Sequence, residues 1–355
     1  MTAAPRAIRH IGFLTPGNYK DDNPYDGLES TLKLLEFGEE LGFDSAWVRQ
    51  RHLEHGISSA GAFLAAASQR TRHIQLGTAV IQIGYESPYR LAEDLSTVDV
   101  LAQGRLNVGV SAGVPAHADL LGPLVFDGDW KDYDLSHERV KRFASHLRGD
   151  FIGAPDTLIV TPFGRHRPRL QPRAKGLVNR LWYGGGSLRS SRWAAQNGFN
   201  LMLSNVTTGE DTDDFFEAQL RQLDIYHVNR ELSWEQRVSI GRVIVPTDSA
   251  DTPTRRKYAA YAASRFERTL KPQGERRILF PQDLVGTSEQ ILERLLEDPV
   301  LAAVTELRLE LPYEFQPHEY QQILSDFVER IAPELGWKRP LHVDQHPVHL
   351  KRGQA

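Results

Sequence analysis

The chain alternates short apolar runs with amphipathic segments along most of its length. In one stretch, an apolar run at 73–81 precedes residues 89–101, where apolar positions recur every three to four residues. The first pattern is typical of a buried strand and the second of a helix that packs on one face. Gly104 can end that helix in the left-handed conformation, and a second apolar run follows at 106–111. This order predicts a βαβ unit, which requires parallel strands with helical cover.

The same order of helix, glycine and strand recurs at Gly42 and Gly198, where a β-carbon would make the left-handed turn costly. We predict eight strands, at Ile8–Leu14, Ser45–Arg49, His73–Ile81, Leu106–Ser111, Arg180–Gly184, Asn200–Ser204, Arg237–Val245 and Glu306–Leu311. We predict helices between and after them, at 27–41, 60–69, 89–101, 135–148, 187–196, 213–228, 253–269 with 288–297, and 317–331.

Eight alternations of strand and helix predict a (β/α)8 TIM barrel, a fold whose active site lies at the carboxyl ends of the strands. We expect residues 1–335 to form this single unit, with insertions at about 149–179 and 247–284. The polar, proline-interrupted tail at 336–355 is expected to pack loosely. A doubly wound open sheet is the rival fold, but no Gly-x-Gly-x-x-Gly motif follows the first strand to support it.

The two insertions exceed ordinary loop length, which is typical of lids, interfaces or disordered segments. The second contains a helix-like piece and is a candidate lid over the active site. The first is basic and can be either a solvated loop or an arm that faces an anion. Its cations are Arg165, Arg167, Arg169, Arg173 and Lys175.

Composition narrows the possible functions. Forty-two Lys and Arg against 46 Asp and Glu give a net charge of −4, which argues against a nucleic-acid surface. The absence of cysteine excludes disulfides, thiolate catalysis and Cys-ligated metal sites. No apolar run has membrane-spanning length and no signal-peptide core is present, so we expect a cytoplasmic protein without membrane or nucleic-acid partners.

Three consecutive glycines, Gly184, Gly185 and Gly186, end the fifth predicted strand, and Ser187 opens the following helix. Glycines let the backbone approach a ligand closely, and a helix N-terminus offers free N–H donors and the positive end of a dipole. Ser187 can cap the helix or donate its hydroxyl to a phosphate oxygen. The pattern indicates a phosphate-binding turn, and a tight turn with a capping serine is the alternative.

Three segments carry a family resemblance: LGTAVIQIGYESPYRLAEDLSTVDVLAQGRLNVGVSAG, LWYGGGSLRSSRWAAQNGFNLML, and LVGTSEQILERLL followed by VTELRLEL. In this order and spacing they resemble the bacterial luciferase-like flavin-dependent monooxygenases, which are (β/α)8 barrels. The first is similar to that family's third and fourth strands, the second to its fifth strand, phosphate loop and sixth strand, and the third to its eighth strand. The likeness covers about 8–205 and 284–332.

The resemblance implies a flavin site at the ends of the third to fifth strands. In the family, the third strand ends in a bulge with a non-prolyl cis peptide, on which the flavin ring rests. Luciferase has an arginine at the phosphate where this chain has Ala112, so Arg189 or an arginine of 165–173 is expected to meet that charge. The implied cofactor-binding residues are Thr78, Ala79, Val80, Ser111, Ala112, Gly113, Gly184, Gly185, Gly186, Ser187 and Arg189.

The catalytic residues implied by the resemblance lie after the second strand, where the family commonly has Glu-His-His and this chain has Gln50, Arg51 and His52. The first of those histidines is a catalytic base in luciferase. Arginine cannot act as a base, but it can hold an anionic substrate or stabilise a peroxide. His52 can act as an acid or base near neutral pH, or can be structural. We predict Arg51 and His52 as catalytic and do not expect the luciferase reaction on long aldehydes.

A metal site is not predicted. His52 and His55, and the histidines of the tail between 342 and 349, have spacings that could attract a metal ion. No catalytic signature such as His-Glu-x-x-His accompanies them.

The function implied by the resemblance is a monooxygenase that uses reduced FMN and O2 on a small organic substrate. Family members usually receive reduced flavin from a separate flavin reductase and commonly dimerise through helices early in the barrel, so we expect both a reductase and a homodimer. Two alternatives stay open. One is a dehydrogenase that uses deazaflavin on the same barrel, and the other is a flavin-binding protein without turnover, which the change at Gln50 and Arg51 would suit.

Overall fold

The computed structural model describes residues 7–231 and 235–340. Eight parallel strands close into a barrel in which each strand pairs with its neighbour along the chain and the last pairs with the first. The predicted TIM barrel is therefore confirmed. The barrel strands are β1 (His10–Thr15), β2 (Ser45–Val48), β3 (Gln75–Gln82), β4 (Leu106–Ser111), β7 (Leu181–Gly185), β8 (Asn200–Leu203), β10 (Val238–Arg242) and β14 (Glu306–Glu310).

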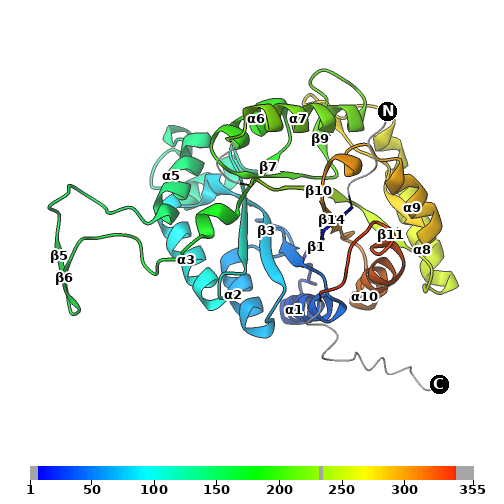
Figure 1. The fold of residues 1–355 in the computed structure, drawn as a ribbon, viewed down its shortest axis with the longest axis horizontal. Helices are drawn as coiled ribbons and strands as arrows, with labels where there is room; N and C mark the ends of the chain where they lie inside the picture. Colours follow the sequence, from blue (N-terminus) through cyan, green and yellow to red (C-terminus); the bar gives the residue numbers. More distant parts are fainter. Residues whose placement is uncertain (1–6, 232–234, 341–355) are drawn as a thin grey trace.

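Helices surround the ring of strands on its outer side (Figure 1). Those that follow barrel strands or insertions are α1 (Pro24–Leu41), α2 (Ala60–Arg70), α3 (Pro88–Leu101), α5 (His137–Arg148), α6 (Leu188–Gln196), α7 (Phe215–Asn229), α8 (Thr252–Phe266), α9 (Ser288–Leu296) and α10 (Pro317–Asp326). They match the predicted helices because their apolar positions face the strands. Helix α4 (Ala118–Val125) was not predicted, since Gly122 and Pro123 within it are poor helix formers.

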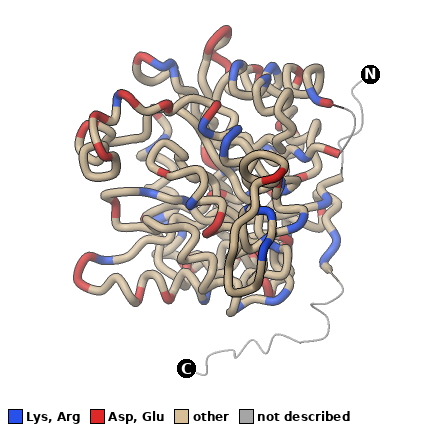
Figure 2. The backbone as a smooth tube through the Cα atoms, turned by 90° about the vertical axis from the view of Figure 1, so that its left-hand side faces the viewer, with Lys and Arg blue, Asp and Glu red and all other residues tan. Residues whose placement is uncertain are grey.

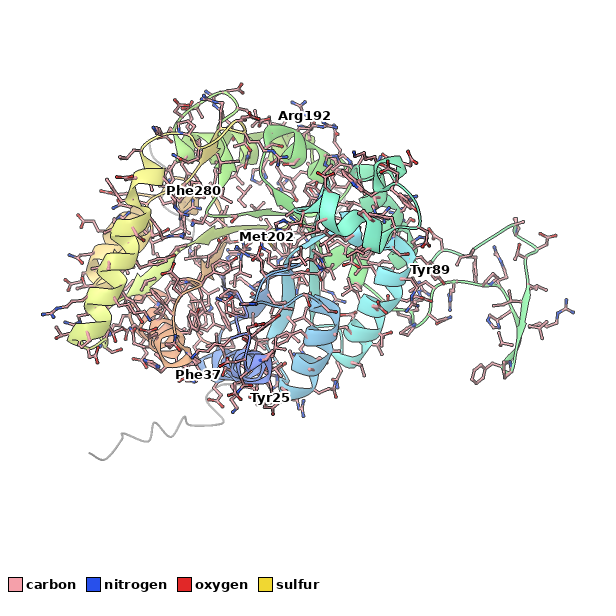
Figure 3. The ribbon with its side chains drawn as sticks, turned by 180° about the vertical axis from the view of Figure 1, so that it is seen from behind. Tyr25, Phe37, Tyr89, Arg192, Met202 and Phe280 are labelled. Carbon is pink, nitrogen blue, oxygen red and sulfur yellow. The ribbon has the colours of Figure 1, made fainter. Side chains whose placement is uncertain are left out.

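The centre of the barrel is filled by two tryptophans rather than open. Trp47 and Trp182 are buried and pack edge to face, with ring centroids 5.6 Å apart. Leu14, Ala79 and Met202 complete this cluster, and Figure 3 shows Met202 within the ring of strands. The cluster fills the barrel interior beneath the carboxyl ends of the strands.

One predicted strand is two strands in the structure. The apolar run at 237–245 contains β10 and then β11 (Ile244–Pro246), which leaves the barrel and pairs with β13 (Leu284–Gly286). Both strands are buried, so both are apolar. The sequence therefore shows one continuous run although the pairing partner changes within it.

The first insertion forms a projecting arm. Its strands β5 (Ile159–Thr161) and β6 (Gly164–His166) make an antiparallel hairpin that extends away from the barrel (Figure 1). Figure 2, in which this arm points toward the viewer, shows the basic residues that it carries. The arm leads away from the strand ends, and the choice between a solvated loop and an arm that faces an anion stays a prediction.

The second insertion is largely packed against the barrel. In α8, Tyr258 and Tyr261 are buried and contact Phe315 with ring centroids 4.6 and 5.2 Å away. Beyond α8, β12 (Ile278–Leu279) pairs with β9 (Thr207–Thr208), which follows β8 at its carboxyl end. A lid would therefore be limited to the segment around β12.

The start of the tail packs more tightly than expected. Trp337 is 5% exposed, and its indole N–H donates a hydrogen bond of 2.8 Å to Asp44. This contact ties the tail to the turn before β2. The tail residues whose spacing could attract a metal ion, His342, His346 and His349 with Asp344, lie outside the described residues.

Candidate active site

A cavity of about 240 Å³ opens at the carboxyl ends of the barrel strands. TIM-barrel enzymes hold their active sites at this end. The lining comes from five barrel strands and from the loops after β2, β7 and β8. It consists of Leu14, Arg49, Gln50, Arg51, Ala79, Val80, Gln82, Gly184, Gly185, Gly186, Met202, Ser204, Val206, Arg308 and Glu310.

Two further hollows lie beside this cavity. Arg51 also lines a hollow of about 200 Å³, and Tyr313 is shared between that hollow and a larger one of about 530 Å³. The larger hollow lies between the loop after β1, with Tyr19, and the loop after β14. The series leads from the barrel mouth past Arg51 toward the molecular surface.

The end of β3 forms one wall of the cavity. The Ala79–Val80 peptide bond is cis, and the pairing of β3 with β4 shifts register between Thr78 and Ile81. Thr78 fixes this turn, because its hydroxyl bridges the backbone N–H and carbonyl of Gly109 at 2.9 Å each. The bulge and the cis bond implied by the family resemblance are thus both observed at the expected residues.

The three glycines lie beside this wall. A β-carbon on Gly184 would lie 3.3 Å from a methyl group of Val80, and one on Gly185 would lie 2.7 Å from Leu201. At Gly186 no atom would come within 4 Å of a β-carbon, so its outer side is open. The turn therefore packs tightly against the barrel and presents its free face at Gly186.

Ser187 is the N-cap of α6. Its hydroxyl accepts from the Ser190 N–H at 3.1 Å, while the Ser190 hydroxyl accepts from the backbone N–H groups of Gly186 and Ser187 at 3.1 and 3.0 Å. This is a capping box, so the alternative of a capping serine is confirmed. It leaves the phosphate assignment open, since capping groups can exchange for a ligand.

An unpredicted carboxylate occupies the N-terminus of α6. Glu210, from the loop after β9, accepts a hydrogen bond of 2.6 Å from the Leu188 N–H. A helix N-terminus attracts anions through its free N–H groups and its dipole. Glu210 thus marks a position at which a phosphate can bind, and its place in a polar loop gave no signal in the sequence.

Of the cations expected to meet a phosphate, Arg189 is well placed and those of the arm are not. Arg189 is exposed on the first turn of α6. Burial, and then the charge of Arg189, lower the pKa of His137, which stacks on Trp193 with centroids 4.5 Å apart. The arm arginine Arg167 instead lies over Phe151, 4.1 Å from the ring centroid.

The residues after β4 lie behind the cavity wall. Ser111 pairs with Gln82, which lines the cavity, and the Ala112 N–H donates to the Tyr183 hydroxyl at 3.2 Å. Gly113 has φ 108°, which favours glycine, and donates to the Leu135 carbonyl at 2.9 Å. The structure therefore places Ser111, Ala112 and Gly113 next to the predicted ring site without placing them in the cavity lining.

Arg51 and His52 face different surroundings. Arg51 lines the cavity, and its Nε atom is buried with no hydrogen-bond partner among the described residues. His52 lies outside the lining and packs edge to face on Tyr85 at 5.1 Å. The side chain of Gln50 is fixed by two hydrogen bonds. It donates to Glu86 at 2.8 Å and accepts from the Ala60 N–H at 3.1 Å.

Sequence reasoning missed the charged residues at the end of β14. Arg308 is 1% exposed, and Glu310 lies 3.5 Å from it and 3.6 Å from Arg49. The segment Glu-Leu-Arg-Leu-Glu at 306–310 has charges at every second position of a buried strand. Period two places such residues on one face of the strand, which in a barrel is the interior, so this signal was available.

Within residues 7–231 and 235–340, no group of three or more His, Asp or Glu side chains is arranged to hold a metal ion.

The model of the luciferase-like monooxygenase family matches residues 9–305. The chain belongs to this family. Among curated luciferase-like relatives, it is 35% identical over 113 residues to 4-hydroxyprotoasukamycin monooxygenase of Streptomyces nodosus subsp. asukaensis, which covers 31% of this chain and 30% of that protein. It is 28% identical to N-acetyl-S-alkylcysteine monooxygenase of Bacillus subtilis (strain 168), over 52% of this chain and 53% of that protein. The chain thus spans a third to a half of the length of these relatives.

A third relative is the oxygenase component of a flavin-dependent trigonelline monooxygenase from Acinetobacter baylyi, 22% identical over 52% of this chain and 50% of that protein. Solved luciferase-like structures share the fold. Monooxygenase RslO1 from Streptomyces bottropensis has a TM-score of 0.69 at 19% identity, over 92% of this chain and 99% of that one.

Two further solved structures carry a named cofactor. The oxygenating constituent of 3,6-diketocamphane monooxygenase from Pseudomonas putida, in complex with FMN, has a TM-score of 0.65 at 14% identity, over 93% of this chain and 99% of that one. An F420-dependent secondary alcohol dehydrogenase has a TM-score of 0.59 at 17% identity, over 92% of this chain and 99% of that one.

Proposed function

We propose that the protein is a flavin-dependent monooxygenase that uses reduced FMN and O2 on a small organic substrate. One observation carries the proposal: the wall at Ala79 and Val80 and the glycine turn that ends at Gly186 line the same cavity at the carboxyl end of the barrel. The first would support a flat ring, and the second would offer a turn for its phosphate. Family membership and the named monooxygenase relatives support the same activity.

The residues of this chain fit the cofactor. The backbone N–H groups of Gly186, Ser187 and Leu188 would take the phosphate oxygens, with the Ser190 hydroxyl and Glu210 displaced and Arg189 adding positive charge. Thr78, with Ala79 and Val80, would support the ring, and Ser111, Ala112 and Gly113 would back the neighbouring wall. When bound, reduced FMN would supply the electrons that activate O2.

Arg51 would act at the reacting edge of the cavity. Its unpartnered Nε atom can donate a hydrogen bond to a bound oxyanion, and its charge is permanent. His52 would serve at the rim, where Tyr85 and Gln50 orient its ring. From there it can move a proton between the cavity edge and water.

The segment around β12 would act as the lid. The Arg277 guanidinium donates to the Gly209 carbonyl at 2.8 Å, next to the Glu210 that phosphate would displace. Displacement of Glu210 by phosphate would therefore move the loop that contacts this segment. Closure of the segment would exclude water from the cavity.

We also propose partners and a location. A separate flavin reductase would supply the reduced cofactor, as the name of one relative, an oxygenase component, supports. A homodimer is the proposed assembly. No helix of the described residues is long and apolar enough to cross a membrane, and a cytoplasmic location is proposed.

The test is O2 consumption with reduced FMN and a panel of small organic compounds. A monooxygenase shows uptake above the uncoupled background with at least one compound, together with a product that has gained one oxygen atom. Uptake at background level with every compound would favour the flavin-binding protein without turnover.

The deazaflavin dehydrogenase remains a second candidate, because the barrel also matches an F420-dependent alcohol dehydrogenase. Separate titrations with FMN and with F420 distinguish the two. Tight binding of F420 with hydride transfer in the absence of O2 would replace the monooxygenase proposal.

A further inference from the structure

The inner surface of the cavity carries an excess of positive charge. Three guanidinium groups line it, from Arg49, Arg51 and Arg308, and among the described lining residues Glu310 is the carboxylate that opposes them. The lining therefore carries two more positive than negative charges. Walls of low polarity, including Met202 and Val80, strengthen the resulting field inside the cavity.

Arg308 is the most deeply placed of these groups. It is 1% exposed, and burial lowers the pKa of its guanidinium, an effect that Glu310 opposes. Its Nη atoms have long contacts of 3.2 Å to the Ser239 hydroxyl and 3.4 Å to the Leu203 carbonyl. Its Nε atom has no partner within the part of the chain that the structure describes. A buried cation with incomplete hydrogen bonding is costly unless a further anion joins it.

Glu310 does not complete either arginine. Its carboxylate lies 3.6 Å from Arg49 and 3.5 Å from Arg308, beyond the distance of a strong charge-assisted hydrogen bond. Its short contact is instead with the Ser204 hydroxyl, which donates to it at 2.9 Å. One carboxylate is thus shared between two guanidiniums, while Arg51 keeps a second unpartnered Nε atom at the same cavity.

We propose that the substrate of this enzyme carries a carboxylate, which binds in this cavity to Arg308 and Arg51. A planar group with two oxygens matches the fork of a guanidinium and would add the anion that the two arginines lack. The inference rests on the proposed function, because it takes the bound carboxylate to be the substrate of the monooxygenase. The binding event does not require a flavin.

The same negative charge has a second possible source, since the ring of reduced FMN is itself anionic. A substrate carboxylate and the ring would compete for the arginines if the ring were the natural occupant. The two sources are separated by measuring carboxylate binding with and without reduced FMN in the absence of O2.

The experiment is anaerobic calorimetric titration of the protein with benzoate and hexanoate, each against its amide, in the presence and absence of saturating reduced FMN. The amides keep the shape and remove the charge. We expect at least one carboxylate to bind, its amide to bind at least tenfold more weakly, and FMN to leave the carboxylate affinity unchanged. The inference would be overturned if neither carboxylate binds, if the acid and its amide bind equally, or if FMN prevents the carboxylate from binding.

Variants locate the site. Arg308→Met and Arg51→Met should each weaken carboxylate binding at least tenfold, whereas Arg192→Met, which removes an exposed arginine of α6, should not. Arg308→Lys keeps the buried charge but loses the planar fork, so it should also weaken carboxylate binding, and it covers the case in which Arg308→Met does not fold. Unchanged carboxylate affinity in Arg51→Met and Arg308→Lys would overturn the assignment. Failure to bind FMN with intact carboxylate binding would instead count against the proposed flavin function.

Discussion

The carboxylate of Glu210 binds the backbone N–H of Leu188 at 2.6 Å, at the helix end that is proposed to hold the cofactor phosphate. The two anions cannot share this N–H group, so cofactor binding must displace the carboxylate. The loop that carries Glu210 is tied by Arg277 to the segment around β12. Phosphate binding is thereby linked to the part of the second insertion that lies at the barrel mouth.

Replacing Glu210 with Gln should strengthen FMN binding, by roughly three- to tenfold, because it removes a negative charge that competes with the phosphate. Titration of FMN by quenching of its fluorescence measures the effect. Asp224→Asn, at an exposed residue of α7, removes the same charge elsewhere and should leave the affinity unchanged. A weaker complex in Glu210→Gln would mean that Glu210 assists the cofactor rather than competing with it.

Ser187→Asp should abolish FMN binding. The substitution places a carboxylate beside the phosphate position, and aspartate is itself a good N-cap, so α6 should remain folded. Circular dichroism checks the fold, and Ser264→Asp on α8 serves as the control for added charge at an exposed serine. Undiminished affinity in Ser187→Asp would reject the phosphate assignment of this turn.

Arg51→Ala should reduce turnover by roughly a hundredfold while changing FMN affinity by less than about threefold, since the side chain lies at the reacting edge and away from the phosphate turn. Steady-state O2 uptake and FMN titration provide the two numbers. Arg51→Lys, which keeps a charge without the fork, should fall between the two proteins. Normal turnover in Arg51→Ala would remove this residue from the mechanism.

Stability should decline as the pH falls, through His10 at the amino end of β1. Burial, and then the charge of Arg237, lower the pKa of His10 to about 3. Arg237 lies 3.4 Å from Nδ1 and can only donate, so Nδ1 accepts and Nε2 donates to the Ser45 hydroxyl at 2.8 Å. Below about pH 6.5 the unfolded chain takes up a proton that the folded chain refuses, so folding stability is full above that pH and is lost between it and about pH 3.

Urea unfolding measures this contribution. Between pH 7 and pH 4 the parent protein should lose about 3 kcal/mol more than His10→Gln, which keeps hydrogen-bonding groups but does not titrate. His55→Gln removes an exposed histidine and should behave as the parent does. Equal pH profiles for the parent and His10→Gln would show that His10 titrates normally in the folded protein.

The sequence predicted the barrel because its signals are local. Glycines such as Gly104 and Gly42 end helices one turn before a buried strand, and both adopt positive φ as expected, at 82° and 91°. What it could not predict depends on tertiary pairing. The split of residues 237–245 follows from a partner strand some forty residues later, and the contact between Glu210 and Leu188 joins two loops with no shared pattern. The interior position of Arg308 is an intermediate case. Its alternation with Glu306 and Glu310 is visible in the sequence, but the cavity that it lines depends on strands far apart in the chain.

The most direct test is a crystal structure of the protein with FMN. The proposed function requires the ring against the cis Ala79–Val80 bond and the phosphate on the N–H groups of Gly186, Ser187 and Leu188, with Glu210 displaced. FMN bound at another place, or a phosphate that leaves the Glu210 contact intact, would contradict it.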